Sequence, residues 1–190
     1  MRLFIAVKIP WASGFDGVVS DVSRCPLKVK WVEKENTHVT LKFLGEVSEA
    51  FVPEIEEALS GALEDAVSGV VVLKGIGGFP NLRRPRVIWV GIEDSGVLRE
   101  LYRKVEEAMV GVGFKREKKS FKPHLTLGRV KRVLSNPQVC MEDVGKRWGE
   151  EEFMRLKVDE VHLIQSILSS TGPTYLTIKS YRLRDQGVDG

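Results

Sequence analysis

The chain has 190 residues, 43% of them hydrophobic and 29% charged, with a formal net charge of +3. This composition is typical of a globular protein and excludes collagen-like, low-complexity and disordered classes. The N-terminal apolar run is interrupted by Lys8 and Pro10, and no run approaches the ~20 residues of a membrane helix, so we expect neither secretion nor membrane insertion. The length fits one domain over residues 1–190, with a loose tail at about 184–190.

The two cysteines occur in unrelated contexts. Cys25 and Cys140 belong to no CxxC or CxxH pattern, so neither a zinc ribbon nor a disulfide framework is indicated. We therefore expect free thiols in a reducing, cytoplasmic compartment. The glycine-rich segment 75–79 is followed by neither Lys-Ser nor a helix, so no ATP site and no cofactor are predicted.

Hydrophobic periodicity predicts strands and helices in mixed order along the chain. Apolar, β-branched or alternating runs predict strands at 2–9, 28–32, 38–45, 71–79, 86–92, 123–130, 156–168 and 174–183. Apolar residues at helical spacing predict helices at 15–22, 52–63, 98–109 and 138–148. Because strands and helices mix without strict alternation, we expect an α+β fold with mostly antiparallel sheets flanked by helices.

One tetrapeptide pattern occurs twice. His38-Val39-Thr40-Leu41 is repeated as His-Leu-Thr-Leu at 124–127, each time in a predicted strand and before a glycine. The repeat predicts two lobes related by an approximate two-fold axis around a central cleft, with the two strands side by side.

The repeated residues have the chemistry of acid–base catalysis at phosphorus. In a strand, residues i and i+2 share a face, so His38 points with Thr40, and His124 with Thr126. Imidazole titrates near pH ~6.5, so one ring can donate a proton while the other accepts one. Threonine hydroxyls and nearby cations can hold phosphate oxygens, which requires no metal.

Other interpretations of the histidines remain open. A single His-x-Thr pair is most often only the polar side of a strand. A three-histidine zinc site of His38, His124 and His162 is a further alternative. His162 lies between Val161 and Leu163, which we expect to face the core, so we place its side chain on the opposite, more exposed face.

Segments in order along nearly the whole chain resemble one family. They are LFIAVKIP, WVEKENTHVTLKFLG, FPNLRRPRVIWVGI, HLTLGRV, EVHLIQSIL and GPTYLTIKSYRL. The family is that of the RNA 2′,3′-cyclic phosphodiesterases, formerly called 2′-5′ RNA ligases, in the two-histidine phosphodiesterase superfamily. The resemblance implies a bilobal fold and metal-independent hydrolysis of a terminal 2′,3′-cyclic phosphate to a 2′-phosphate, with 2′-5′ ligation as the reverse activity.

The resemblance also implies individual roles. His38 is similar to the proton donor for the leaving 3′ oxygen, His124 to the base that activates water, and Thr40 and Thr126 to phosphate contacts. Arg129 follows the second motif and is a candidate phosphate ligand, although its spacing from His124 puts it on the opposite strand face unless the chain bends at Gly128. The family often has another arginine just after this one, where this sequence has Lys131 and Arg132.

The expected partner is RNA with a cyclic phosphate end, bound by a monomer. From Lys115 to Arg132 there are eight basic residues against Glu117 alone, and Arg83, Arg84 and Arg86 form a second basic loop. Both could follow an RNA backbone, or be solvated faces. The candidates for stacking on the terminal base are Trp31, Phe43, Phe79 and Tyr181. A small-nucleotide phosphodiesterase and a non-catalytic RNA-binding module are the alternative functions.

Overall fold

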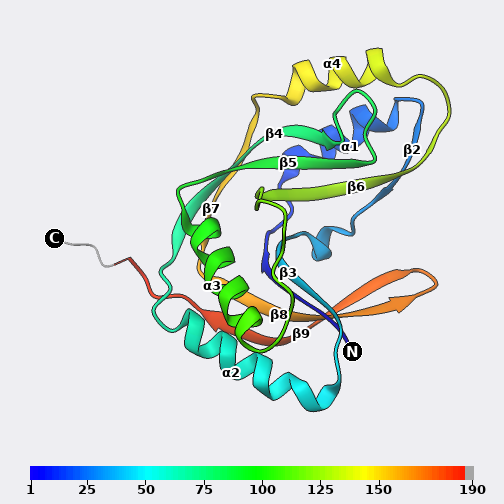
Figure 1. Cartoon of the computed structure of the whole chain (residues 1–190). Helices are drawn as coiled ribbons and strands as arrows, with labels where there is room; N and C mark the ends of the chain where they lie inside the picture. Colours follow the sequence, from blue (N-terminus) through cyan, green and yellow to red (C-terminus); the bar gives the residue numbers. More distant parts are fainter. Residues whose placement is uncertain (187–190) are drawn as a thin grey trace.

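The computed structural model describes residues 1–186, and residues 187–190 of the expected tail lie outside this part. It contains two antiparallel sheets with helices packed on them, which confirms the α+β class (Figure 1). The α-helices are α1 (Ser13–Ser23), α2 (Val52–Leu63), α3 (Val97–Gly111) and α4 (Gln138–Trp148). The strands are β1 (Arg2–Lys8), β2 (Leu27–Trp31), β3 (His38–Glu46), β4 (Gly69–Phe79), β5 (Val87–Asp94), β6 (His124–Val133), β7 (Glu152–Val158), β8 (Glu160–Ser169) and β9 (Gly172–Arg182).

The two sheets share one internal arrangement. The four-stranded sheet has the order β3-β1-β8-β9, and the five-stranded sheet has the order β2-β6-β5-β4-β7. The three strands β3-β1-β8 correspond to β6-β5-β4. The four-stranded sheet takes β8 and β9 from the second half of the chain. The sequence repeat therefore reflects two lobes built around equivalent motif strands.

The helices cover one face of each sheet. Helices α2 and α3 pack on the four-stranded sheet and on each other, whereas α1 and α4 pack on the five-stranded sheet (Figure 1). The apolar residues buried beneath them form one continuous cluster that includes residues of both sheets. None of the helices within residues 1–186 is both long and apolar enough to cross a membrane.

The expected strand at 156–168 is two strands in different sheets. β7 ends at Val158 in the five-stranded sheet, and β8 begins at Glu160 in the four-stranded sheet. The chain changes sheets at Asp159, where neither glycine nor proline marks a break. The prediction was wrong because it joined two apolar alternations of different phase, Leu156 with Val158 and Val161 with Leu163, into one strand.

The prediction of free thiols was also wrong. Cys25 and Cys140 form a disulfide, with their Cα atoms 5.6 Å apart. Cys25 lies just after α1 and Cys140 lies in α4, and these two helices contact each other. The pairing follows from helix packing between distant segments, which cysteine spacing along the chain does not reveal.

The glycines of β4 are required by close packing. Gly75 has a φ of 71°, and the carbonyl oxygen of Gly149 occupies the place where its Cβ would lie. At Gly77 the indole ring of Trp89 covers that place. These residues weaken the strand pattern in the sequence because each allows another group to approach the backbone.

The start of the expected tail is held by backbone hydrogen bonds. The Arg184 amide donates to the carbonyl of Ala66 at 2.9 Å, and the Ser68 amide donates to the carbonyl of Arg184 at 2.8 Å. Arg184 also pairs with Val67 in a short parallel bridge.

Candidate active site

His38 and His124 occupy equivalent positions, each as the first residue of its strand. In the four-stranded sheet, Thr40 lies opposite Ala6, and in the five-stranded sheet Thr126 lies opposite Trp89. Paired side chains in antiparallel strands share a face, so each sheet has a face that carries its His-x-Thr pair, which we call the histidine face. The intervening Val39, Leu125 and their neighbours on the other face are part of the main core.

Both imidazoles are held in the same way by the backbone. The Nδ1 atom of His38 lies 2.7 Å from the carbonyl oxygen of Asn36, and that of His124 lies 2.7 Å from the carbonyl oxygen of Lys122. A carbonyl oxygen can only accept, so Nδ1 carries the hydrogen and donates it. Each ring is thereby left with Nε2 as the atom that can give or take a proton.

The segment before His38 is fixed to the end of β1. The buried Thr37 hydroxyl donates to the carbonyl of Ile9 at 2.7 Å, and the Ile9 amide donates to the carbonyl of Thr37 at 3.0 Å. These bonds leave little freedom to the backbone from which the imidazole projects.

Two aromatic rings pack against each histidine. His38 contacts Phe4 and Tyr175, with ring centroids 5.0 and 5.4 Å apart. His124 has Phe79 at 5.1 Å, edge-on, and Trp89 at 6.3 Å. Phe4, Tyr175 and Trp89 were not predicted in this role. The local signal for Phe4 was the alternation that places it with Ala6 on one face of β1.

The surroundings of His38 favour its neutral form. Burial lowers the pKa of His38 below the ordinary imidazole value, and the hydrogen bond to Asn36 opposes this effect only in part. The half-buried hydroxyls of Thr40 and Thr126 have no hydrogen-bond partner within residues 1–186. Both hydroxyls are therefore free to bind an oxygen atom of a ligand.

A bulge in each motif strand decides where the next side chain points. In β6 the register against β5 shifts after Thr126, so that Arg129 lies opposite Val87 on the histidine face. The bend at Gly128 that Arg129 needed is thus present. In β3 the register against β1 shifts at the same point, and Phe43 takes the equivalent place opposite Phe4.

The two motifs lie close together although they belong to different sheets. Strands β3 and β6, which carry the two motifs, contact each other. Burial raises the pKa of the Tyr175 hydroxyl, and the nearby positive charge of Arg129 opposes this rise. Arg129 therefore acts on the lobe that carries His38.

The stacking candidates fall into different environments. Phe43 is 70% exposed, whereas Tyr181 is buried in the core, with its hydroxyl near the carbonyl of Glu56. Phe79 packs against His124, and Trp31 packs against the core beside Gly128. Phe43 is the exposed aromatic ring among the four candidates.

The basic segments are exposed and mostly unpaired. Lys115 through Lys122 lies in a loop before β6, and none of its basic side chains is within ion-pair distance of a carboxylate of residues 1–186. Arg84 and Arg86 are likewise unpaired in the described part, whereas Arg83 pairs with Glu142 at 3.1 Å. Apart from Arg83, the basic side chains of these two segments are therefore free of ion pairs in the part of the chain that the structure describes.

His162 lies on the expected side of β8, but it is not exposed. Only 7% of the residue is accessible, and its ring lies 2.9 Å from the Ser180 hydroxyl and 3.7 Å from the Glu160 carboxylate. It lies opposite Ala6, which places it on the histidine face. Within residues 1–186, no three His, Cys, Asp or Glu side chains gather as metal ligands, so the three-histidine site is not formed.

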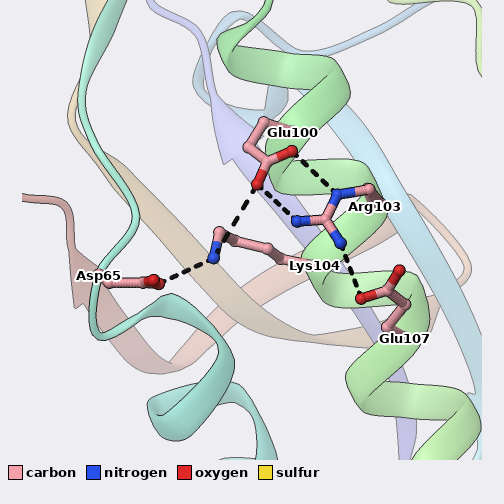
Figure 2. Close-up of polar contacts among 5 residues, drawn as sticks. All are labelled: Asp65, Glu100, Arg103, Lys104 and Glu107. Atoms are coloured by element: carbon pink, nitrogen blue, oxygen red, sulfur yellow. Dashed lines mark hydrogen bonds and ion pairs between the residues drawn. The ribbon is translucent and has the colours of Figure 1, made fainter.

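A hollow of ≈820 Å³ lies elsewhere, between α2 and α3. Its rim carries an ion-pair network in which Lys104 bridges Asp65 and Glu100, and Arg103 bridges Glu100 and Glu107 (Figure 2). These charges are mutually satisfied, and the pKa of Asp65 is lowered mainly by its hydrogen bond to Lys104. The hollow is therefore a structural feature of the helix pair.

Comparison with known proteins agrees with this architecture. The family model described as the 2'-5' RNA ligase superfamily matches residues 20–168. An Archaeoglobus fulgidus protein named RNA 2',3'-cyclic phosphodiesterase is 39% identical over 188 residues, covering 95% of this chain and 99% of that protein. The chain therefore belongs to the 2'-5' RNA ligase superfamily.

Solved structures show the same two-lobed fold. A crystal structure of a Thermus thermophilus protein superposes with a TM-score of 0.77 at 28% identity, covering 98% of this chain and 100% of that one. The crystal structure of E. coli LigT complexed with 3'-AMP gives 0.70 at 26% identity, covering 96% and 97%.

Proposed function

We propose that this protein hydrolyses the 2′,3′-cyclic phosphate at the end of an RNA to a 2′-phosphate, without a metal ion. The names of the relatives across nearly the whole chain support cyclic phosphodiesterase activity. The observation that carries the mechanism is the duplicated imidazole geometry. In both motifs Nδ1 is bound to a backbone carbonyl, Nε2 has no hydrogen-bond partner within residues 1–186, and a threonine hydroxyl shares the face.

The reaction then needs two proton transfers. Nε2 of His124 takes a proton from water as the water oxygen forms a bond to phosphorus. The bond from phosphorus to the ribose 3′ oxygen breaks, and Nε2 of His38 supplies the proton to that oxygen. In 2′-5′ ligation the 5′ hydroxyl of a second RNA takes the place of water, so His124 accepts its proton and His38 again protonates the leaving 3′ oxygen. The two histidines exchange roles when the 2′-5′ bond is cleaved back to the cyclic phosphate.

The remaining groups stabilise the charge on phosphorus. The hydroxyls of Thr40 and Thr126 donate hydrogen bonds to the two non-bridging oxygens, and Arg129 adds positive charge from the histidine face of β6. The unpaired cations of the 115–122 loop and of the 83–86 loop attract the RNA strand, so that affinity falls with salt.

The assembly and compartment belong to the same proposal. Both motifs lie in one chain and the core runs through both lobes, which supports a monomer with a single catalytic domain over residues 1–190. We infer a cytoplasmic location from the RNA substrate. The disulfide is compatible with a cytoplasmic location in hyperthermophiles, where intracellular proteins retain disulfides.

The test is hydrolysis of an oligoribonucleotide ending in a 2′,3′-cyclic phosphate, in the presence of EDTA. We expect the wild type to give a 2′-phosphate, and His38→Gln and His124→Gln each to lose at least ~100-fold in kcat/KM. Thr40→Ser and Thr126→Ser retain most activity, whereas the isosteric Thr→Val variants lose it with an unchanged melting temperature.

Three results would contradict the proposal. Activity that disappears with EDTA and returns with a divalent ion would refute metal independence. Turnover of cyclic mononucleotides but not of RNA ends would indicate the small-nucleotide alternative. RNA binding that depends on the histidines, without any turnover, would indicate a binding module.

A further inference from the structure

A second hollow, of ≈490 Å³, lies where the chain crosses from β7 to β8. One wall is formed by residues of β1, β8 and β9, among them Lys8, His162, Thr177 and Ser180. Residues 156–160 at the crossover form the other wall. Because Lys8 and His162 lie on the histidine face of the four-stranded sheet, this hollow belongs to the same side of the sheet as His38.

Lys8 links the hollow to the proposed active site. It lies directly opposite His38 in the pairing of β1 with β3, so the two side chains are neighbours on one face. Its ammonium group donates to the Thr177 hydroxyl at 2.6 Å. No carboxylate of residues 1–186 lies within ion-pair distance of Lys8, which leaves an uncompensated, exposed cation beside His38.

The far side of the hollow offers hydrogen-bond acceptors. Glu160 lies 3.7 Å from Nε2 of His162, whose Nδ1 is 2.9 Å from the Ser180 hydroxyl. Asp159 and Glu160 also pair with the exposed Arg182, at 3.9 and 3.4 Å. The hollow thus presents a cation and hydroxyls near His38, and carboxylate oxygens further away. The cation and hydroxyls suit a phosphate group, and the carboxylate oxygens suit the hydroxyl groups of a ribose beyond it.

The direction of the proposed reaction places the RNA strand on this side. In an in-line displacement, water enters opposite the leaving oxygen, so the terminal ribose lies on the side of His38. The 5′ oxygen of that ribose carries the phosphodiester that joins it to the preceding nucleotide. The rest of the RNA therefore leaves the active site over the four-stranded sheet.

We propose that Lys8 and the hollow behind it form a subsite for the phosphodiester and ribose that precede the terminal nucleotide. Lys8 and the Thr177 hydroxyl bind the phosphodiester, and the carboxylates at the crossover accept from the 2′-hydroxyl of the preceding ribose. This subsite, which rests on the proposed function, makes the enzyme prefer RNA ends to cyclic mononucleotides.

The test compares two substrates with the same terminal base: a nucleoside 2′,3′-cyclic phosphate and a dinucleotide ending in one. We expect Lys8→Met to lower kcat/KM for the dinucleotide about tenfold more than for the mononucleotide, as for loss of a charged hydrogen bond. Lys8→Arg retains the preference. For the dinucleotide, the plot of log kcat/KM against log salt has a negative slope. In Lys8→Met this slope becomes less negative by about 0.7, as expected when one contact to a single strand is lost.

Lys146→Met is the matched control, because it removes the same charge from an exposed site on α4. It should leave the ratio between the two substrates unchanged. Equal effects of Lys8→Met on both substrates, or none on either, would refute the subsite while leaving the phosphodiesterase intact. If the wild type hydrolysed neither substrate, the proposed function would fail, and this inference with it.

Discussion

Lys42 on β3 and Glu106 on α3 form a 2.8 Å ion pair from which water is almost excluded, with side chains 7% and 5% exposed. Lys42 also donates to the carbonyl of Lys115 at 3.0 Å, and Glu106 accepts from the amide of Glu117 at 2.6 Å. The pair therefore connects the first motif strand to the basic loop that leads into the second.

Breaking one half of this pair should destabilise the protein strongly. Glu106→Ala leaves a buried ammonium group without its partner, and we expect the free energy of unfolding to fall by about 3–5 kcal/mol in urea denaturation. The double variant Lys42→Met/Glu106→Met should recover most of the loss, because no unpaired charge remains. A change below about 0.5 kcal/mol in Glu106→Ala would contradict this account.

The pH dependence of activity should reflect the burial of His38. The proposed acid must be protonated in the free enzyme, and burial lowers its pKa, so the His38 limb of kcat/KM should fall as pH rises through values below ~6.5. The pH profile of kcat reports the enzyme–substrate complex, in which the bound phosphate anion favours the imidazolium form of His38. The His38 limb of that profile should therefore lie at higher pH than in kcat/KM. A kcat/KM limb for His38 above about pH 7 would show that burial does not control this group.

The wall behind His124 can be tested through Gly77. A Cβ at this position overlaps the indole of Trp89, so Gly77→Ala must displace the ring that lies 6.3 Å from His124. We expect a loss of about 1–3 kcal/mol in stability, as for overpacking, and a lower kcat. Gly61→Ala is the control, because nothing lies within 4 Å of its Cβ in α2, and it should stabilise the helix slightly. Unchanged kcat in Gly77→Ala would mean that Trp89 has no part in positioning His124.

The disulfide should contribute to stability because it closes a long segment. Cys25 and Cys140 are 115 residues apart in sequence, and we expect Cys140→Ser to lower the free energy of unfolding by about 2–5 kcal/mol. Thiol titration of the denatured protein should find no free thiol before reduction and two after it. Two free thiols in the purified, unreduced protein would show that the bridge does not form in solution.

Local patterns were sufficient for much of the fold and for the centre of the site. Strands and helices were predicted because alternation and helical spacing are properties of neighbouring residues. The pairing of His38 with Thr40, and of His124 with Thr126, on one strand face follows from the same periodicity. The repeat of this pattern predicted the two lobes.

Pairing between distant segments decided the rest. The change of sheet at Asp159, the aromatic rings around each histidine and the burial of His162 all depend on which strands lie next to one another. The bulge that returns Arg129 to the histidine face is set by the register of β6 against β5. The disulfide depends on the contact between α1 and α4.

By itself, the sequence determined which groups could carry out the chemistry, because residue type and strand alternation are local. Only the tertiary structure decided what surrounds those groups, because packing joins residues that are far apart in the chain.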